Sequence, residues 1–162
     1  MDITAFFRMT YGVFVLTAKE GDKDNGCIIN TPVQVANNPT RISIAVIAQN
    51  KTCDMIKETG EFNISSISEK ASFDLFKHFG MQSGRDVDKF ADFTGVKRAE
   101  NGIYYVTEQT NMYMSAKVVE SHDLGSHMLF IAEVTEAEVL SNDPSATYGY
   151  YQTVIKPQPE KP

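Results

Sequence analysis

Hydrophobic residues along this chain fall mostly into short runs that are β-branched and aromatic or that alternate with polar residues. Such runs are typical of strands, and they predict strands at 12–18, 27–36, 41–48, 62–67, 103–106, 113–119 and 127–140. Asn25-Gly26 tolerates positive φ and predicts a hairpin turn, Asn38-Pro39 predicts a second turn, and 120–126 is the turn expected before the last strand. The first three strands are therefore expected to form an antiparallel meander.

Helical spacing of apolar residues occurs in only a few short segments. Asn50 is a candidate N-cap for a helix over 51–60, which is expected to end at Gly60. Phenylalanines recur at helical spacing within 70–79, and a brief helix is expected at 88–93. Many short strands, two or three short helices and no regular alternation of strand and helix predict a mainly β barrel with helical insertions.

One predicted strand is interrupted by residues that strands disfavour. The segment 27–36, CIINTPVQVA, begins and ends like a strand but carries Asn30, Thr31 and Pro32 in its middle. A proline there removes a ladder donor, which is tolerated at a sheet edge, at a bulge or at a functional site. The pattern alone leaves these three alternatives open.

The length of the chain indicates a single domain, and its negative net charge argues against nucleic acid and anionic membranes as partners. A chain of 162 residues with a net charge of −6 is enough for one domain with a core, and it lacks the basic face that nucleic acid or an anionic membrane surface requires. No apolar run approaches membrane-spanning length, and the N-terminus lacks the features of a secretory signal. Cys27 and Cys53 form no CxxC pair, so we expect structural thiols in a reducing cytoplasm and small molecules as partners.

Several common catalytic motifs are missing from the sequence. There is no GxGxxG after a strand, no GxxxxGK[ST] and no GxSxG, and the three histidines are not at metal-ligand spacing. A Ser-His-Asp grouping stays open, but nothing in the sequence supports it, and we expect no metal site.

Three polar patches instead interrupt or follow apolar runs. Hydroxyls, amides, free N–H groups at a helix start and a few cations suit a phosphate monoester in an otherwise acidic protein. Each patch also has a purely structural interpretation: an edge bulge, helix capping and a solvated loop with charge pairs. The patches are Asn30-Thr31, then Gln49-Asn50-Lys51-Thr52, and then 83–90, SGRDVDKF.

The order of these patches resembles the flavin reductase-like family of FMN-binding split β-barrel proteins. The resemblance runs from about Met9 to Tyr151. Within this family, the chain resembles flavoredoxins and the flavin domain of rubredoxin-fused flavoproteins. The fold that this resemblance implies is an antiparallel, Greek-key split barrel over 1–152, followed by a Pro-rich tail or linker at 153–162. Its segments are YGVFVLTA, NGCIINTPVQVANNPTRISIAVIAQNKT, SGRDVDKF and GSHMLFIAEVTEAEVL.

The resemblance also implies which residues bind the cofactor. Asn30 and Thr31 are expected to reach FMN, and the backbone at Pro32 and Val33 to approach its ring. The ribityl chain and phosphate are expected at 48–52, and Lys89 and Phe90 to close over them. The complete expected set is Asn30, Thr31, Pro32, Val33, Ala48, Gln49, Asn50, Lys51, Thr52, Gly84, Lys89 and Phe90.

The same resemblance implies the activity. A hydride would pass from NADH or NADPH to flavin N5, and electrons would pass on to free flavin or a rubredoxin-like acceptor. His127 matches a family histidine near the flavin and nicotinamide, but Ser126 stands where the family usually has Asp. An FMN electron carrier without its own nicotinamide site, and an enzyme like pyridoxamine-phosphate oxidase, are the alternatives. A homodimer is also implied.

Overall fold

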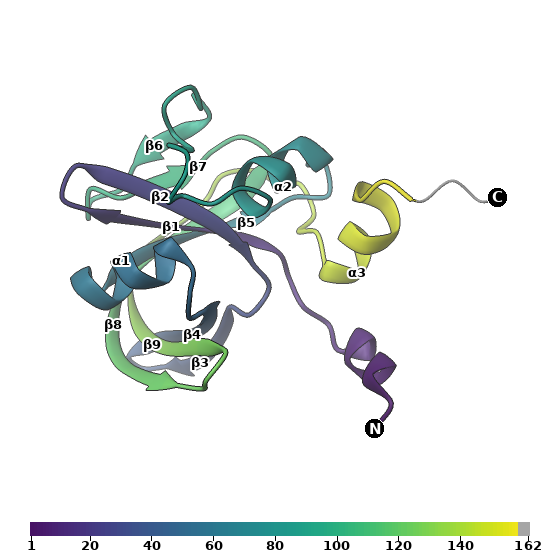
Figure 1. Cartoon of the computed structure of the whole chain (residues 1–162), viewed down its shortest axis with the longest axis horizontal. Helices are drawn as coiled ribbons and strands as arrows, with labels where there is room; N and C mark the ends of the chain where they lie inside the picture. The colour runs from purple at the N-terminus through teal and green to yellow at the C-terminus, as the bar shows by residue number, and fades with distance from the viewer. Residues whose placement is uncertain (159–162) are drawn as a thin grey trace.

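The computed structural model describes residues 1–158, and these form one long antiparallel sheet with a few short helices (Figure 1). The sheet has the strand order β2-β1-β5-β8-β9-β4-β3, and a separate ribbon pairs β6 with β7. The strands are β1 (Phe14–Glu20), β2 (Lys23–Ile29), β3 (Val33–Asn37), β4 (Thr40–Ile47), β5 (Glu61–Ile67), β6 (Val96–Arg98), β7 (Tyr104–Val106), β8 (Thr110–Asp123) and β9 (His127–Val139). The helices are η1 (Ile3–Arg8), α1 (Lys51–Thr59), α2 (Phe73–Gly80), α3 (Tyr148–Tyr150) and η2 (Tyr151–Ile155).

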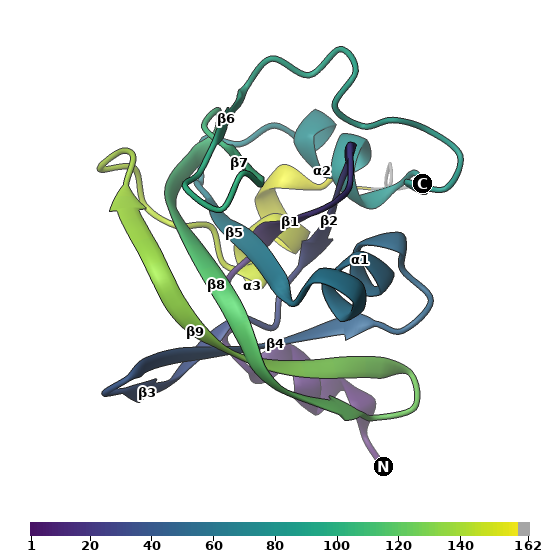
Figure 2. The same ribbon diagram turned by 90° about the vertical axis from the view of Figure 1, so that its left-hand side faces the viewer.

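The long strands β8 and β9 curve the sheet into a split barrel (Figure 2). Their pairing shifts register between Ser115 and Ala116 and again between Val118 and Glu120, and such bulges bend and twist a strand pair. The expectation of a mainly β, antiparallel split-barrel fold is confirmed.

The interrupted segment 27–36 is two strands. β2 ends at Ile29 and β3 begins at Val33, and these strands form opposite edges of the sheet. The expected meander is therefore wrong, because β2 pairs with β1 and β3 pairs only with β4. Pro32 immediately precedes an edge strand, which is one of the few places where a sheet tolerates proline.

Several local expectations needed correction. The hairpin turns at Gly21 (φ 58°), and Asn25-Gly26 lies inside β2, because a glycine five residues earlier already supplies the positive φ. The segment 88–93 forms turns and bends where we expected a helix. β8 extends to Asp123, which leaves only 124–126 as the turn before β9.

The expected helices at 51–60 and 70–79 are present. Asn50 caps α1 by accepting a hydrogen bond from Thr52 N (2.9 Å), and Gly60 ends the helix in the left-handed conformation (φ 73°). α2 begins at Phe73, three residues later than expected. Not predicted were η1, β6 and the C-terminal helices α3 and η2, the last of which extends to Ile155.

The hydrophobic core has two main parts on opposite sides of β1. One lies inside the barrel, where α1 contributes Met55 and Ile56 against Phe62 and Phe130. The other lies under α2, where Phe76 and Phe79 pack with partly buried tyrosines of the C-terminal helices. The second part holds α2 and the C-terminal segment against the same side of the sheet. In the part of the chain that the structure describes, no helix has the length and apolar character needed to span a bilayer.

Candidate functional site

A polar pocket of about 390 Å³ opens at the N-terminus of α1, and we call it the helix pocket. The turn after β4 and the first residue of α1 place Gln49, Asn50 and Lys51 on one side of the pocket. The loop after α2 forms the other side. The first N–H groups of a helix have no intrahelical partner and carry a partial positive charge, so this geometry favours an anion. The lining residues are Cys27, Ile28, Ile47, Gln49, Asn50, Lys51, Phe79, Gly80, Met81, Gln82, Ser83, Gly84 and Lys89.

Lys89 places a buried cation at this pocket. Its side chain is 3% exposed, and its Nζ donates hydrogen bonds to the carbonyls of Gly26 (2.7 Å) and Phe79 (2.9 Å). Among residues 1–158 no carboxylate lies within ion-pair distance of Lys89. Burial lowers the pKa of Lys89, and a neighbouring thiol, Cys27, acts weakly in the opposite direction. A buried ammonium without a counter-ion is costly, which favours an anionic ligand at this position.

His78 holds the backbone of Lys89 in place. Its Nε2 lies 2.6 Å from the Lys89 carbonyl oxygen, a distance at which it donates a hydrogen bond. The imidazole also stacks on Phe93 with ring centroids 5.0 Å apart. The loop between α2 and β6 is therefore tied to α2 at the residue that carries the buried cation.

The other cations near the helix pocket have acidic partners. Lys51 pairs with Glu20 (3.0 Å), and Arg85 pairs with Asp54 (2.6 Å). The hydrogen bond from Arg85 is the main reason why the pKa of Asp54 is lowered. Lys51 and Arg85 therefore carry less uncompensated charge than Lys89.

Thr52 and Asn25 lie beneath the helix pocket. Both side chains are buried, and Asn25 Nδ2 donates a hydrogen bond to Thr52 Oγ1 (3.0 Å). Asn25 Oδ1 has no hydrogen-bond partner in the described structure. A Cβ on Gly84 would lie only 2.1 Å from that oxygen, so a glycine is required for the loop to close against the Asn25 amide.

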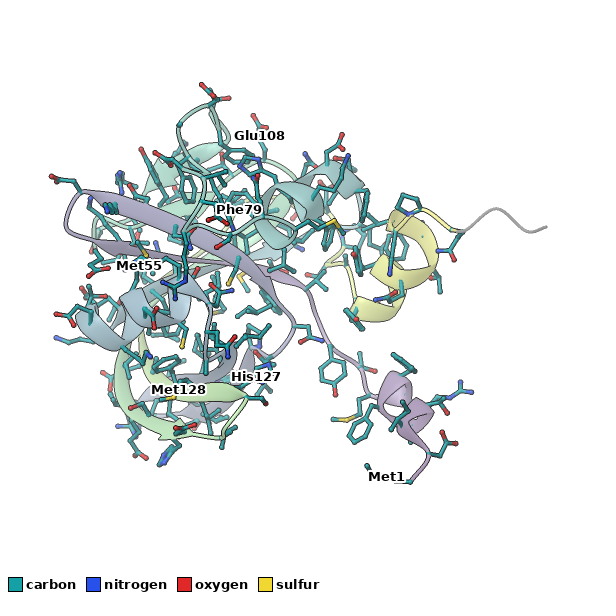
Figure 3. The ribbon with its side chains drawn as sticks, in the orientation of Figure 1. Met1, Met55, Phe79, Glu108, His127 and Met128 are labelled. Atoms are coloured by element: carbon teal, nitrogen blue, oxygen red, sulfur yellow. The ribbon has the colours of Figure 1, made fainter. Side chains whose placement is uncertain are left out.

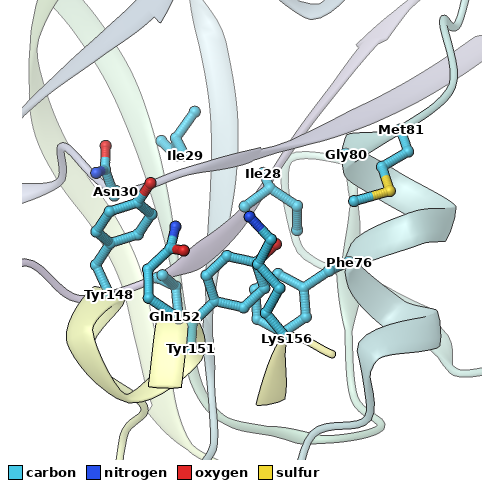
Figure 4. Close-up of a pocket in the computed structure, with 11 residues that line it drawn as sticks. Ile28, Ile29, Asn30, Phe76, Gly80, Met81, Tyr148, Tyr151, Gln152 and Lys156 are labelled. Atoms are coloured by element: carbon cyan, nitrogen blue, oxygen red, sulfur yellow. The ribbon is translucent and has the colours of Figure 1, made fainter. Parts of the chain in front are cut away.

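A second pocket, of about 370 Å³, adjoins the helix pocket, and we call it the tyrosine pocket (Figure 4). The two pockets share the lining residues Ile28, Gly80 and Met81, so they lie side by side, and we call the pair the groove. The aromatic side chains of Phe76 and Tyr151 stack in its wall with centroids 4.2 Å apart. Its lining residues are Val13, Ile28, Ile29, Asn30, Phe76, Gly80, Met81, Tyr148, Tyr151, Gln152 and Lys156.

The predicted site residues divide between these surfaces. Gln49, Asn50, Lys51, Gly84 and Lys89 line the helix pocket, whereas Asn30 lines the tyrosine pocket. Phe90 lines a third pocket, which meets the helix pocket at Lys51 and Gly84.

The remaining predicted residues lie outside these pocket walls. Thr31 is held by both backbone groups of Ala45, at 2.8 and 2.9 Å, and Ala48 N donates to Ser126 O (3.0 Å). Pro32 and Val33 lie at the start of the edge strand, and Val33 is 57% exposed.

His127 lies beside the rim of the helix pocket. It is the cross-strand partner of Ile47, which lines that pocket. Its Nδ1 lies 2.9 Å from Ser126 Oγ, and the ring is half-buried. Figure 3 shows His127 in the lower part of the barrel, beside Met128 and below Phe79. The structure therefore brings His127 near the groove without making it part of the wall.

Sequence reasoning missed the C-terminal part of the groove. Tyr148, Tyr151, Gln152 and Lys156 follow the last predicted strand, and Lys156 lies within the stretch 153–162 where we expected the tail. The cluster of tyrosines at 148–151 was the available signal, because aromatic residues that are close in sequence at a chain end need a surface to cover.

Comparison with known proteins gives a consistent result. Residues 6–157 match the family described as "Flavin reductase like domain". The chain is 37% identical to the high molecular weight rubredoxin of Moorella thermoacetica, over 95% of this chain and 67% of that protein. It is 31% identical to a ferric-chelate reductase (NAD(P)H) of Archaeoglobus fulgidus, over 96% of this chain and 92% of that protein.

Solved structures show the same fold. An NADH:FAD oxidoreductase of Streptomyces globisporus superposes with a TM-score of 0.81 at 18% sequence identity, covering 90% of this chain and 85% of that one.

Proposed function

The chain belongs to the family of flavin reductase like domains, and from that premise we propose that it is an FMN-binding, NAD(P)H-dependent flavin oxidoreductase. The family and the ferric-chelate reductase relative establish a flavin oxidoreductase in general terms. The identity of the flavin, the nicotinamide cosubstrate and the acceptor are our proposal, and the geometry of the groove supports it.

The single observation that carries the proposal is the buried ammonium of Lys89 in the pocket at the N-terminus of α1. Two independent sources of positive potential, this cation and the helix N-terminus, meet in one pocket of an otherwise acidic protein. A phosphate monoester supplies the negative charge that this pocket lacks. We therefore place the FMN phosphate in the helix pocket, held by Lys89, Asn50, Lys51 and the backbone around Gly84.

The tyrosine pocket fits the rest of the cofactor. It adjoins the helix pocket, with which it shares lining residues, and its wall of aromatic and aliphatic side chains suits a flat ring. Asn30 and Gln152 add amide donors and acceptors along its edge. In this arrangement the short link 30–32 between β2 and β3 presents the polar side chain of Asn30 to the ring. The interruption of the segment 27–36 by polar residues would then serve cofactor binding.

The chain contributes binding and orientation, and the cofactor supplies the redox chemistry. Bound FMN would accept a hydride from the nicotinamide and pass two electrons to the acceptor. In our proposal the groove orients the ring and partly shields it from water, and His127 beside the rim contacts the nicotinamide. No general base from the protein is needed for hydride transfer.

An electron carrier without a nicotinamide site is the second candidate. One observation favours it: Ser126 Oγ lies within hydrogen-bond distance of His127 Nδ1, which uses a ring nitrogen that could otherwise contact a cosubstrate. The relative named high molecular weight rubredoxin also suggests a rubredoxin-like protein as the acceptor.

Anaerobic stopped-flow reduction of the FMN-loaded protein separates the two functions. Our proposal predicts that NADH or NADPH bleaches the bound flavin at a catalytically useful rate, and that His127→Ala slows this reduction without releasing FMN. His122→Ala is the matched control, because the His122 side chain is exposed and its polar partner is the exposed Glu120, outside the groove. Retained flavin that neither nucleotide reduces would reject the reductase and leave the carrier.

We also propose a homodimer. The helix η1 projects from the body of the protein (Figure 1), and it carries no buried residue although Phe6 and Phe7 are 54% and 71% exposed. Exposed aromatic side chains on a projecting segment are typical of an interaction surface. A second copy of the chain is the partner that the family resemblance implies.

A further inference from the structure

Lys156, which directly follows η2, brings a positive charge into the tyrosine pocket. Of the eleven residues that line this pocket, Lys156 alone has a charged side chain. Figure 4 shows its side chain running along the ring of Tyr151 toward Ile28, into the pocket. Within residues 1–158 no carboxylate lies within ion-pair distance of its Nζ.

A wide helical turn places Lys156 there. η2 is a π-helix, and Lys156 N donates to the carbonyl of Tyr151 (2.8 Å), a bond between residues five apart. In an α-helix, the carbonyl of Tyr151 would accept a hydrogen bond from Ile155 N. The π-helical bond instead brings Lys156 to the turn above Tyr151. π-turns are uncommon and frequently occur at functional sites.

Neighbouring contacts hold the turn in position. Tyr151 stacks on Phe76 of α2, and the Gln158 side chain donates to the carbonyls of Gln152 (2.8 Å) and Lys156 (3.0 Å). These hydrogen bonds show that the first residues of the expected extended tail fold back on the helix; the remainder, 159–162, lies outside the described residues. Burial raises the pKa of Tyr151, so its phenol stays neutral and does not offset the lysine charge.

We propose that Lys156 contacts the flavin ring and stabilises its reduced form. This inference rests on the proposed function, because it requires the ring to occupy the tyrosine pocket. A hydride brings two electrons and one proton from the nicotinamide, which is oxidised, so the ring gains one negative charge. A cation beside the ring favours that charge and has no such effect on the neutral, oxidised ring.

The reduction potential of bound FMN tests this role directly. Lys156→Gln keeps a side chain of similar length but removes the charge, so the preference for reduced over oxidised flavin should fall about tenfold. For a two-electron couple this lowers the midpoint potential by about 30 mV. Binding of oxidised FMN should change little, because the oxidised ring carries no charge for Lys156 to stabilise.

Two control variants separate this effect from others. Lys156→Arg keeps the charge and should retain most of the wild-type potential. Lys117→Gln removes an exposed lysine on β8 outside the groove, and should leave the potential unchanged although the net charge changes equally. The potential is measured by equilibration with a reference dye, and FMN affinity by fluorescence titration.

The possible results are distinct. A lowered potential in Lys156→Gln alone supports the inference. An unchanged potential in Lys156→Gln with FMN still bound would overturn the inference and leave the proposed function intact. Failure of the wild-type protein to bind FMN would overturn both.

Discussion

At the scale of single residues, two of the lysines that line the groove differ in burial. Lys89 is buried, and its ammonium is held by the carbonyls of Gly26 and Phe79 at the helix pocket, where we propose that the phosphate binds. Lys156 is exposed and lines the tyrosine pocket, where we propose that the flavin ring lies. A buried cation makes the pocket selective for negatively charged ligands. A cation at a pocket wall instead stabilises the more negative state of a ligand that is already bound.

Replacing Lys89 should therefore weaken the binding of FMN far more than that of riboflavin, which lacks the phosphate. A hydrogen bond between charged groups contributes about 1.5–3 kcal/mol, so Lys89→Met should reduce FMN affinity by roughly 10- to 100-fold. Fluorescence titration with both flavins measures this. An equal loss for FMN and riboflavin would instead show a general disturbance of the pocket, which circular dichroism and thermal unfolding would reveal.

The buried thiol Cys27 predicts a pH dependence of stability. Burial is the main reason why its pKa is raised from 9.0 to about 11, against smaller opposing effects of Thr52 and Lys89. Between these pH values the unfolded chain loses the thiol proton while the folded chain keeps it. The free energy of unfolding should thus fall by ~2–3 kcal/mol as pH rises across this window.

Urea unfolding at several pH values compares the wild type with Cys27→Ala. Since other groups also titrate in this range, the quantity of interest is the difference between the two proteins. That difference should shrink as pH rises from about 9 to about 11, in accordance with the raised thiol pKa. A difference that is independent of pH would contradict the assignment to Cys27.

At the scale of elements, the groove depends on how α1, α2 and the following loop meet β2. The caps of α1 were predictable, because Asn50 and Gly60 act through local backbone geometry. The segment 88–93 was wrongly expected to be helical because its apolar spacing is local, whereas its conformation follows from long-range contacts. Lys89 bonds to β2 and α2, and its carbonyl accepts from His78.

The same distinction explains what could be predicted of the site. The N-terminus of α1 is a local feature, and the resemblance predicted Lys89 and Gly84 as cofactor ligands; both line the helix pocket. The C-terminal wall could not be predicted, since Tyr151 and Lys156 reach the groove only through packing against α2 and a π-turn. In addition, the stretch after residue 152 is rich in proline, and its composition predicted a linker where Lys156 lines the groove.

The contact between Gly84 and Asn25 gives a prediction for the loop. A Cβ at Gly84 would lie 2.1–2.4 Å from the Asn25 amide, so Gly84→Ala must displace the loop or the buried amide. Such overpacking typically costs about 1–3 kcal/mol. Gly149→Ala is the matched control, because its Cβ would meet only Thr147 Oγ1 at 3.7 Å.

Chemical unfolding and FMN titration of both variants provide the measurement. Gly84→Ala should lower both the free energy of unfolding and the affinity for FMN, and Gly149→Ala should change neither by more than a few tenths of a kcal/mol. Wild-type stability and affinity in Gly84→Ala would show that the loop tolerates the extra carbon and does not close against Asn25.

At the scale of the whole molecule, the sheet brings the sequence-distant parts of the groove together. The chain crosses from β2 to β3, at opposite edges of the sheet, through Asn30-Thr31-Pro32, and this crossing leaves Asn30 at the groove. The same fold leaves η1 projecting with exposed aromatic residues. The proposed homodimer would cover them.

Light scattering coupled to size-exclusion chromatography tests the dimer. The expected mass is about twice the chain mass of 18.1 kDa. Phe6→Ser combined with Phe7→Ser should shift the equilibrium toward the monomer, because burial of two aromatic side chains drives the association. A wild-type mass of one chain at working concentration would reject the dimer.

The most direct test of the central claim is an equilibrium titration of the wild-type protein with FMN and, separately, with riboflavin. If the helix pocket holds the phosphate through Lys89 and the N-terminus of α1, FMN should bind at least about tenfold more tightly than riboflavin, and high salt should reduce this difference. Equal affinities for the two flavins would contradict the phosphate site, and with it the assignment of the groove.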